Sequence, residues 1–162
     1  MIAGEGTELI RRPAKDIYEF VLDLEQYKRA DLKIGTVHSV TWREDHAEIS
    51  YSGRFRGIPT PAVRQTVTVE PYRRIDVRSI PGTLAHFASE FHGLFTFEEI
   101  GGGTTRVFHR EALVFRAPLG WIVEPLLRDW LANDTPEEVR RMKVLLESEA
   151  RSPIDAVAHR SG

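Results

Sequence analysis

Residues 34–115 follow an alternation of hydrophobic and polar positions that predicts a series of β-strands. Ala47, Ile49 and Tyr51 alternate with Glu48 and Ser50, and the same alternation returns in residues 63–69 and 75–78. No helical spacing interrupts these strands, and turn residues separate them. The pattern therefore predicts an antiparallel meander and disfavours a parallel sheet built from βαβ units.

The strand that precedes Gly101 carries phenylalanines on a single face. Residues 87, 91, 95 and 97 are all phenylalanine and share one face, opposite polar residues such as Glu90 and His92. This face is expected to be buried. It is either part of an ordinary core or the wall of a cavity, and the pattern alone leaves both interpretations open.

Two short helices are predicted near the start of the chain. Pro13 suits the first helical position, and Ala14, Ile17 and Tyr18 begin an apolar stripe at helical spacing. Asp23 is placed to cap a second short helix that runs to about residue 30.

A long amphipathic helix is predicted after Pro118. Its first apolar stripe and its second stripe point in different directions, so one straight helix cannot bury both on one surface. Thr135, Pro136 and Glu138 between them fit a capping box, which predicts a kink or short break within residues 133–136. Trp130 is expected to face the sheet and Trp121 to lie at the surface. The first stripe comprises Leu119, Ile122, Val123, Leu126, Leu127 and Trp130, and the second comprises Val139, Met142, Leu145 and Leu146.

Charge and composition exclude several classes of protein. The net charge of −2 gives no basis for binding nucleic acid, and the absence of cysteine excludes disulfides and thiolate metal sites. No apolar run has the length needed to span a bilayer, and the first residues do not resemble a signal peptide. A cytoplasmic protein without integral membrane association is expected. The oligomeric state stays open.

No sequence motif for a cofactor, a metal or a nucleophile is present. The chain has no P-loop, no Gly-x-Gly-x-x-Gly sequence and no Gly-x-Ser-x-Gly elbow, and its six histidines lack metal-ligand spacing. Neither a cofactor nor a metal is expected.

The glycine turn at residues 101–103 allows the faces of the final strand to be inferred. If Phe97 lies opposite Val107, then Phe95 lies opposite His109, and opposed residues share a face. His109 and Glu111 would then point toward the phenylalanines and place a titratable pair in an apolar interior. A one-residue bulge in the turn would instead leave both side chains in solvent.

These features together resemble the START/birch-pollen-allergen superfamily, also called SRPBCC, and within it the bacterial polyketide cyclase/dehydrase-like branch. The resemblance covers residues 5–147 and rests on Asp23–Tyr27, on the run from Gly103 to Val107 and on Pro118-Leu119. It implies an α+β helix-grip fold, in which a curved antiparallel sheet of about six or seven strands wraps a long C-terminal helix. A single domain over residues 1–150 and a flexible tail over residues 151–162 are expected.

The resemblance implies a hydrophobic small-molecule ligand, such as a lipid, a polyketide or an aromatic compound, bound between the sheet and the C-terminal helix. The alternative is a cyclase/aromatase acting on a polyketide-like substrate, with His109 and Glu111 as acid/base candidates. A third possibility is an interaction module that uses the outer face of the sheet. The expected ligand-binding residues are Tyr51, Gln65, Phe87, Phe91, Phe95, His109, Glu111, Ile122, Leu126 and Trp130.

Overall fold

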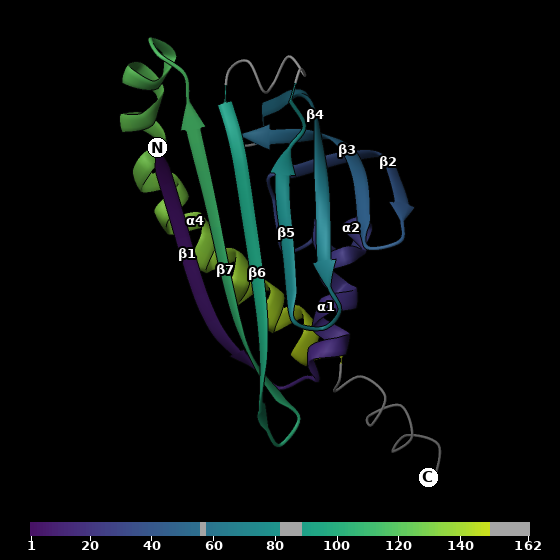
Figure 1. Cartoon of the computed structure of the whole chain (residues 1–162). Coiled ribbons are helices and arrows are strands. Elements are labelled where there is room, and N and C mark those ends of the chain that lie inside the picture. Colours follow the sequence, from purple (N-terminus) through teal and green to yellow (C-terminus); the bar gives the residue numbers. More distant parts are fainter. Residues whose placement is uncertain (56–57, 82–88, 150–162) are drawn as a thin grey trace, which may run out of the picture.

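A seven-stranded antiparallel sheet forms the body of the protein in a computed structural model that describes residues 1–55, 58–81 and 89–149. The strand order is β1-β7-β6-β5-β4-β3-β2, so the first two strands lie at opposite edges (Figure 1). The strands are β1 (Ile2–Ile10), β2 (Ile34–Arg43), β3 (His46–Phe55), β4 (Ile58–Glu70), β5 (Arg74–Ser79), β6 (Ser89–Gly101) and β7 (Thr104–Phe115). The α+β helix-grip prediction, with its antiparallel meander, is confirmed.

Three described helices accompany the sheet. They are α1 (Ala14–Leu22), α2 (Leu24–Tyr27) and α4 (Leu119–Glu149). The long helix α4 crosses one face of the sheet and packs on β1 and β7 (Figure 1). Within the described ranges, no helix combines the length and apolar character needed to cross a bilayer. The tail predicted over residues 151–162 lies outside the described residues.

The connection between β1 and β2 carries the two short helices as predicted. Helix α1 begins one residue after Pro13 and buries Ala14, Ile17 and Tyr18. The carboxylate of Asp23 accepts hydrogen bonds from two backbone N–H groups of α2, at 3.1 and 3.2 Å. This capping satisfies donors that a helix start would otherwise leave unpaired.

The hairpin of β6 and β7 has the register inferred from the sequence. Phe97 lies opposite Val107 and Phe95 opposite His109. The three turn glycines have φ values of 96°, 62° and 68°, a region that side chains with a Cβ rarely adopt. A bulge between Glu99 and Gly101 is absorbed inside the turn and does not shift the strands. The alternative, solvent-facing register is wrong.

Helix α4 does not break where the capping box predicted it. It runs without interruption from Leu119 to Glu149 and contains both Pro125 and Pro136. The Thr135 hydroxyl lies 3.0 Å from the Leu131 carbonyl, inside the helix, so it does not act as a cap. The predicted short break is therefore wrong, and the kink within residues 133–136, the other form of the prediction, stays a prediction. The same side chains that fit a capping box are used for tertiary contacts instead.

The two apolar stripes of α4 have different surroundings. The second stripe packs on the sheet, and Val139 and Met142 are completely buried. In the first stripe, Ile122 and Leu126 remain 68% and 69% exposed, which corrects the prediction that they face the sheet. Ile122 and Leu126 lie on the outer side of this segment, whereas Leu127 and Trp130 line the cavity. Trp121 is exposed, as predicted.

Candidate functional site

A cavity of about 450 Å³ lies between the sheet and the segments that cover it. Strands β2 to β7 supply most of its wall, and α1, α2, α4 and the segment between α2 and β2 supply the rest. Most of the lining is apolar and includes Ile49, Val67, Ile75 and Phe95. A volume of this size is typical of a binding site for a small molecule.

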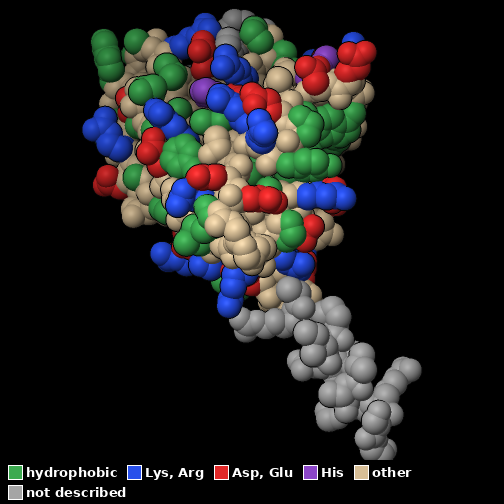
Figure 2. Space-filling model, turned by 60° about the horizontal axis from the view of Figure 1, so that its bottom comes forward, with side chains coloured by type: hydrophobic (Ala, Val, Ile, Leu, Met, Phe, Trp, Pro, Cys, Tyr) green, Lys and Arg blue, Asp and Glu red, His purple; other side chains and the backbone are tan. Residues whose placement is uncertain are grey.

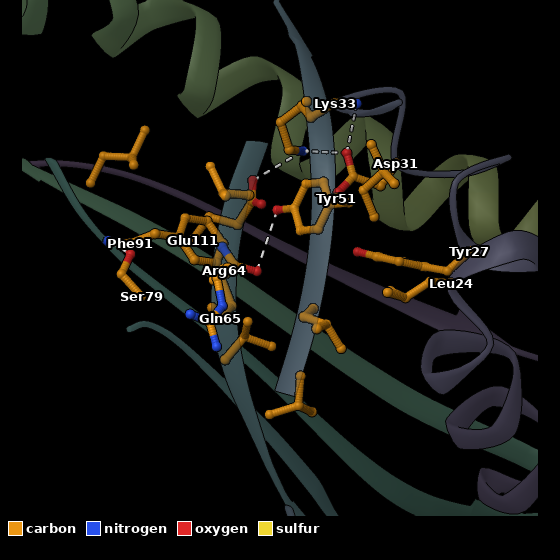
Figure 3. A pocket seen from close by; sticks show the side chains of 18 of the residues that line it. Leu24, Tyr27, Asp31, Lys33, Tyr51, Arg64, Gln65, Ser79, Phe91 and Glu111 are labelled. Carbon is orange, nitrogen blue, oxygen red and sulfur yellow. Dashed lines mark hydrogen bonds and ion pairs between the residues drawn. The ribbon is translucent and has the colours of Figure 1, made fainter. Parts of the chain in front are cut away.

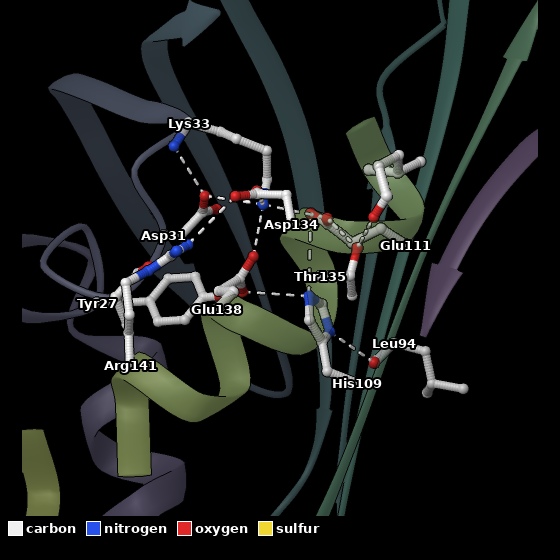
Figure 4. A network of polar contacts seen from close by, with 12 residues as sticks. Tyr27, Asp31, Lys33, Leu94, His109, Glu111, Asp134, Thr135, Glu138 and Arg141 are labelled. Atoms are coloured by element: carbon white, nitrogen blue, oxygen red, sulfur yellow. Dashed lines mark hydrogen bonds and ion pairs between the residues drawn. The ribbon is translucent and has the colours of Figure 1, made fainter. Parts of the chain in front are cut away.

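Charged side chains gather at one part of this wall around a buried lysine. The Lys33 ammonium lies 3.0 Å from Asp31 Oδ1, 3.1 Å from Glu111 Oε2 and 3.0 Å from Asp134 Oδ2, and it also pairs with Glu138 Oε2 (Figure 4). Four carboxylates therefore surround one cation. We call this group, together with Tyr27, His109 and Arg141, the Lys33 cluster.

Lys33 keeps its charge in spite of burial. Burial by itself lowers the pKa of an ammonium, but the four carboxylates, Asp31 first, raise the pKa of Lys33 well above its usual value. The side chain is 18% exposed. An amine held in this way cannot act as a nucleophile, because it has no free lone pair.

His109 joins the cluster from β7. Its Nδ1 lies 3.0 Å from the Leu94 carbonyl, so this nitrogen carries a proton and donates it. Its Nε2 is 3.2 Å from Glu138 Oε1 and 3.9 Å from Glu111 Oε1. Burial lowers the pKa of His109, but Glu138 and Glu111 outweigh it and raise the pKa above the usual value. The imidazole ring is stacked on the Phe95 ring, with 3.8 Å between the two ring centroids.

Glu138 connects three members of the cluster. It accepts a hydrogen bond from the Tyr27 hydroxyl and pairs with both Lys33 and His109. Burial raises the pKa of this carboxyl, but the two cations hold it well below its usual range. The pKa of Tyr27 is raised far above its usual value by burial and by Glu138. Glu138 is therefore ionised and Tyr27 is neutral at physiological pH.

Asp31 is the member of the cluster that titrates near neutrality. Burial and the carboxylates of Glu138 and Glu111 raise its pKa to about 7, although Lys33 opposes them. Arg141 completes the outer side, where it donates to the Ala30 carbonyl at 2.7 Å.

A second polar pair lies on the sheet side of the cavity. The Tyr51 hydroxyl donates to Gln65 Oε1 at 3.3 Å, and both side chains line the wall (Figure 3). Burial raises the pKa of Tyr51, so its hydroxyl stays protonated. The two residues offer hydrogen bonds without a net charge.

The structure brings seven of the ten predicted ligand-binding residues to the cavity wall. These are Tyr51, Gln65, Phe91, Phe95, His109, Glu111 and Trp130. Ile122 and Leu126 do not line it, because both are exposed on the outer side of α4. Phe87 lies outside the described residues.

Most of the Lys33 cluster could not be placed from the sequence. Asp31 and Lys33 lie in the short segment before β2, which has no periodic pattern that would place their side chains. Asp134 and Glu138 are four residues apart on α4, and this spacing was an available signal for a shared helix face. The sequence also fits Glu138 to a capping box, which gives no reason to expect it in the interior.

Three donor atoms of the cluster lie close enough to hold a metal ion. One atom each from His109, Glu111 and Glu138 fall within 4.8 Å of one another. The Lys33 ammonium already pairs with the other oxygen of both glutamates. A resident cation therefore neutralises much of the charge that would attract a metal.

The surface outside the cavity is mixed in charge. On the face shown in Figure 2, acidic and basic side chains are interspersed, and hydrophobic side chains lie between them. This face therefore has no large region of a single charge sign.

One family model matches almost the whole chain. The family is described as "Polyketide cyclase / dehydrase and lipid transport", and the match covers residues 1–147. In sequence, no protein of curated function matches.

Solved structures share the fold at low identity. The Zhui aromatase/cyclase from Streptomyces sp. R1128 superposes with a TM-score of 0.77 at 14% identity, over 93% of this chain and 96% of that one. A START superfamily protein from Mycobacterium smegmatis gives 0.65 at 14% identity, over 90% and 97%. Human STARD10 gives 0.66 at 14% identity, over 96% and 67%. These similarities concern the fold.

Proposed function

Since the chain belongs to the polyketide cyclase/dehydrase and lipid transport family, we propose that its cavity binds a hydrophobic small molecule, such as a lipid, a polyketide or another aromatic compound. The observation that carries this proposal is the 450 Å³ cavity with its largely apolar wall. Burial of apolar ligand surface there is favourable by about 25 cal/mol per Å². The Tyr51–Gln65 pair and the Lys33 cluster supply the few polar groups that orient such a ligand.

Binding can be tested without knowing the natural ligand. Native mass spectrometry of protein purified from its own host is expected to show a retained apolar molecule. Val77→Trp places a large side chain in the cavity from β5, and this variant is expected to retain no apolar molecule. Val144→Trp changes a residue of α4 that is 62% exposed, and this control is expected to retain the molecule as the wild type does. Absence of any retained molecule, together with no saturable binding of an apolar fluorescent probe, would contradict the proposal.

A second candidate function is a cyclase/aromatase reaction in the same cavity. It is favoured by one observation, an imidazole and a carboxylate that line the wall together at His109 and Glu111. A protonated His109 would act as a general acid toward a ligand carbonyl, and Glu111 would act as the base.

Binding and turnover separate these two functions. If the protein is an enzyme, His109→Gln and Glu111→Gln each lower the conversion rate of a bound polyketide-like substrate by about 10²–10⁴-fold while the ligand still binds. If it is a carrier, the wild type returns the ligand unchanged. The exposed variant Glu137→Gln serves as the matched control.

A further inference from the structure

The charged groups on the cavity wall differ in how many of their hydrogen-bonding positions are already occupied by protein partners. Asp31, Lys33 and Glu111 converge beside Tyr51 at the polar end of the cavity (Figure 3). A ligand that enters the cavity with a polar group meets this end or remains at the rim. The partners already bound to each charged group therefore decide which polar group the end can accept.

The Lys33 ammonium has no hydrogen-bonding capacity left for a ligand. It has three N–H donors, and four carboxylates lie within ion-pair distance of it. An incoming anion would have to displace one of these carboxylates and leave it buried without a partner. Such displacement is costly in a desolvated site.

Glu111, in contrast, lines the cavity and has one carboxylate oxygen that accepts no hydrogen bond from the described residues. Its Oε2 is used by Lys33 and by the Thr135 hydroxyl, both at 3.1 Å. Its Oε1 lies 3.9 Å from His109 Nε2, which is beyond hydrogen-bond distance. This oxygen can accept a hydrogen bond from a ligand without breaking an existing one.

The charges of the cluster also disfavour an additional anion. Four carboxylates, those of Asp31, Glu111, Asp134 and Glu138, lie within ion-pair distance of the single Lys33 ammonium, and Arg141 adds a second cation beside Asp134. A ligand carboxylate placed among them would add a further negative charge to this group. A hydroxyl group adds none, and an ammonium group adds a positive charge.

On the premise of the proposed function, we infer that the cavity selects an apolar ligand whose inner end is a hydrogen-bond donor, a hydroxyl or an ammonium group, and rejects the corresponding carboxylate. Glu111 Oε1 is the acceptor for this donor, and Asp31 lies beside it on the same wall. Glu111 is in this respect a specificity-determining residue.

The other two basic side chains of the wall, Arg54 and Arg64, offer a carboxylate a different position. Both are exposed, and Arg64 pairs with Glu48 at 3.0 Å. A carboxylate bound there would stay hydrated at the rim with its apolar part inside. Tight carboxylate binding would therefore show that the rim, not the inner end, decides specificity.

Four naphthalene derivatives of one size test the inference by titration at about pH 8, where the acid is ionised. They are 2-methylnaphthalene, 2-naphthylmethanol, 2-naphthylmethylamine and 2-naphthoate. The alcohol and the amine are expected to bind at least about tenfold more tightly than the carboxylate, which corresponds to the cost of one unsatisfied buried polar group. Equal or tighter binding of the carboxylate overturns the inference. Failure of all four, 2-methylnaphthalene included, contradicts the proposed function itself.

The Glu111→Gln variant tests whether Glu111 is responsible for this ligand preference. The variant removes the charge and adds an amide donor. The preference for the alcohol and the amine over 2-naphthoate is therefore expected to shrink by about tenfold. Glu137→Gln, an exposed change on α4, is expected to leave it unchanged. A preference that persists in a folded Glu111→Gln protein overturns the assignment to this residue. If that variant does not fold, the wild-type ranking of the four ligands still decides the inference.

Discussion

The two halves of α4 lie in one continuous helix, but the first half exposes apolar side chains and the second half buries a charged one. In the first half, residues 119–130, the apolar side chains of Trp121, Ile122 and Leu126 are exposed. In the second half, residues 131–146, the carboxylate of Glu138 is 1% exposed and lies beside a buried Met142. Hydrophobicity alone does not decide burial here. The second half is buried because β1 and β7 pack against it and because Lys33 and His109 compensate its charge.

Removal of Lys33 is expected to have the largest effect on this arrangement. Lys33→Met leaves the carboxylates of Asp134 and Glu138 buried without their main cation, which costs about 3–5 kcal/mol of unfolding free energy. Chemical denaturation measures this loss. Lys15→Met is the matched control, because Lys15 forms only an exposed pair with Glu19 at 3.8 Å and its loss costs about 0–1 kcal/mol. Equal losses would mean that the cluster contributes no more than a surface pair.

One truncation in each half of α4 tests the comparison directly. Met142→Ala creates a cavity against the sheet and is expected to lower the unfolding free energy by about 2–5 kcal/mol. Leu126→Ala removes an exposed side chain and is expected to change it by less than about 0.5 kcal/mol. Thermal and denaturant unfolding of both variants provide the measurement. A large loss at Leu126 would show that the first half is covered in solution.

A smaller loss of unfolding free energy is expected where β1 closely contacts the second half of α4. A Cβ at Gly4 would lie 2.3 Å from the Leu131 carbonyl oxygen and 2.3 Å from Thr135 Oγ1. Gly4→Ala therefore forces the strand and the helix apart, at a cost of about 1–3 kcal/mol. Thr7→Ala, at an exposed position of the same strand, is the control in the same denaturation assay. A neutral Gly4→Ala would show that the helix shifts without loss.

A further expected effect is a change in pH dependence. The pKa of Asp31 is raised from 3.8 to about 7, so the folded protein holds a proton that the unfolded chain releases in this window. This group therefore makes stability fall as pH rises from 3.8 to about 7. Asp31→Asn lacks this proton, so its stability relative to the wild type is expected to increase across the same window. A difference that does not vary with pH, measured by denaturation across the window, contradicts the assignment to Asp31.

The sequence predicted the sheet side of the site better than the helix side. His109 and Glu111 could be placed because strand side chains alternate strictly and a glycine turn determines their register. Lys33 could not, because its position depends on a non-periodic segment that meets a helix about a hundred residues further along the chain. Glu138 was assigned to a cap because local sequence fits that motif equally well. Only the packing of α4 on the sheet distinguishes a capping carboxylate from a buried one.

The pairing of β1 with β7 has a consequence for the order of events during synthesis. Ile2 lies opposite Leu113, so the first strand has no partner until almost the whole sheet has left the ribosome. Contacts between residues so distant in sequence slow folding, because a long loop must close before any of them forms. The nascent chain consequently carries this strand without a partner until β7 has been synthesised, and unpaired edge strands promote aggregation. The strand that is synthesised first is among the last to join the sheet.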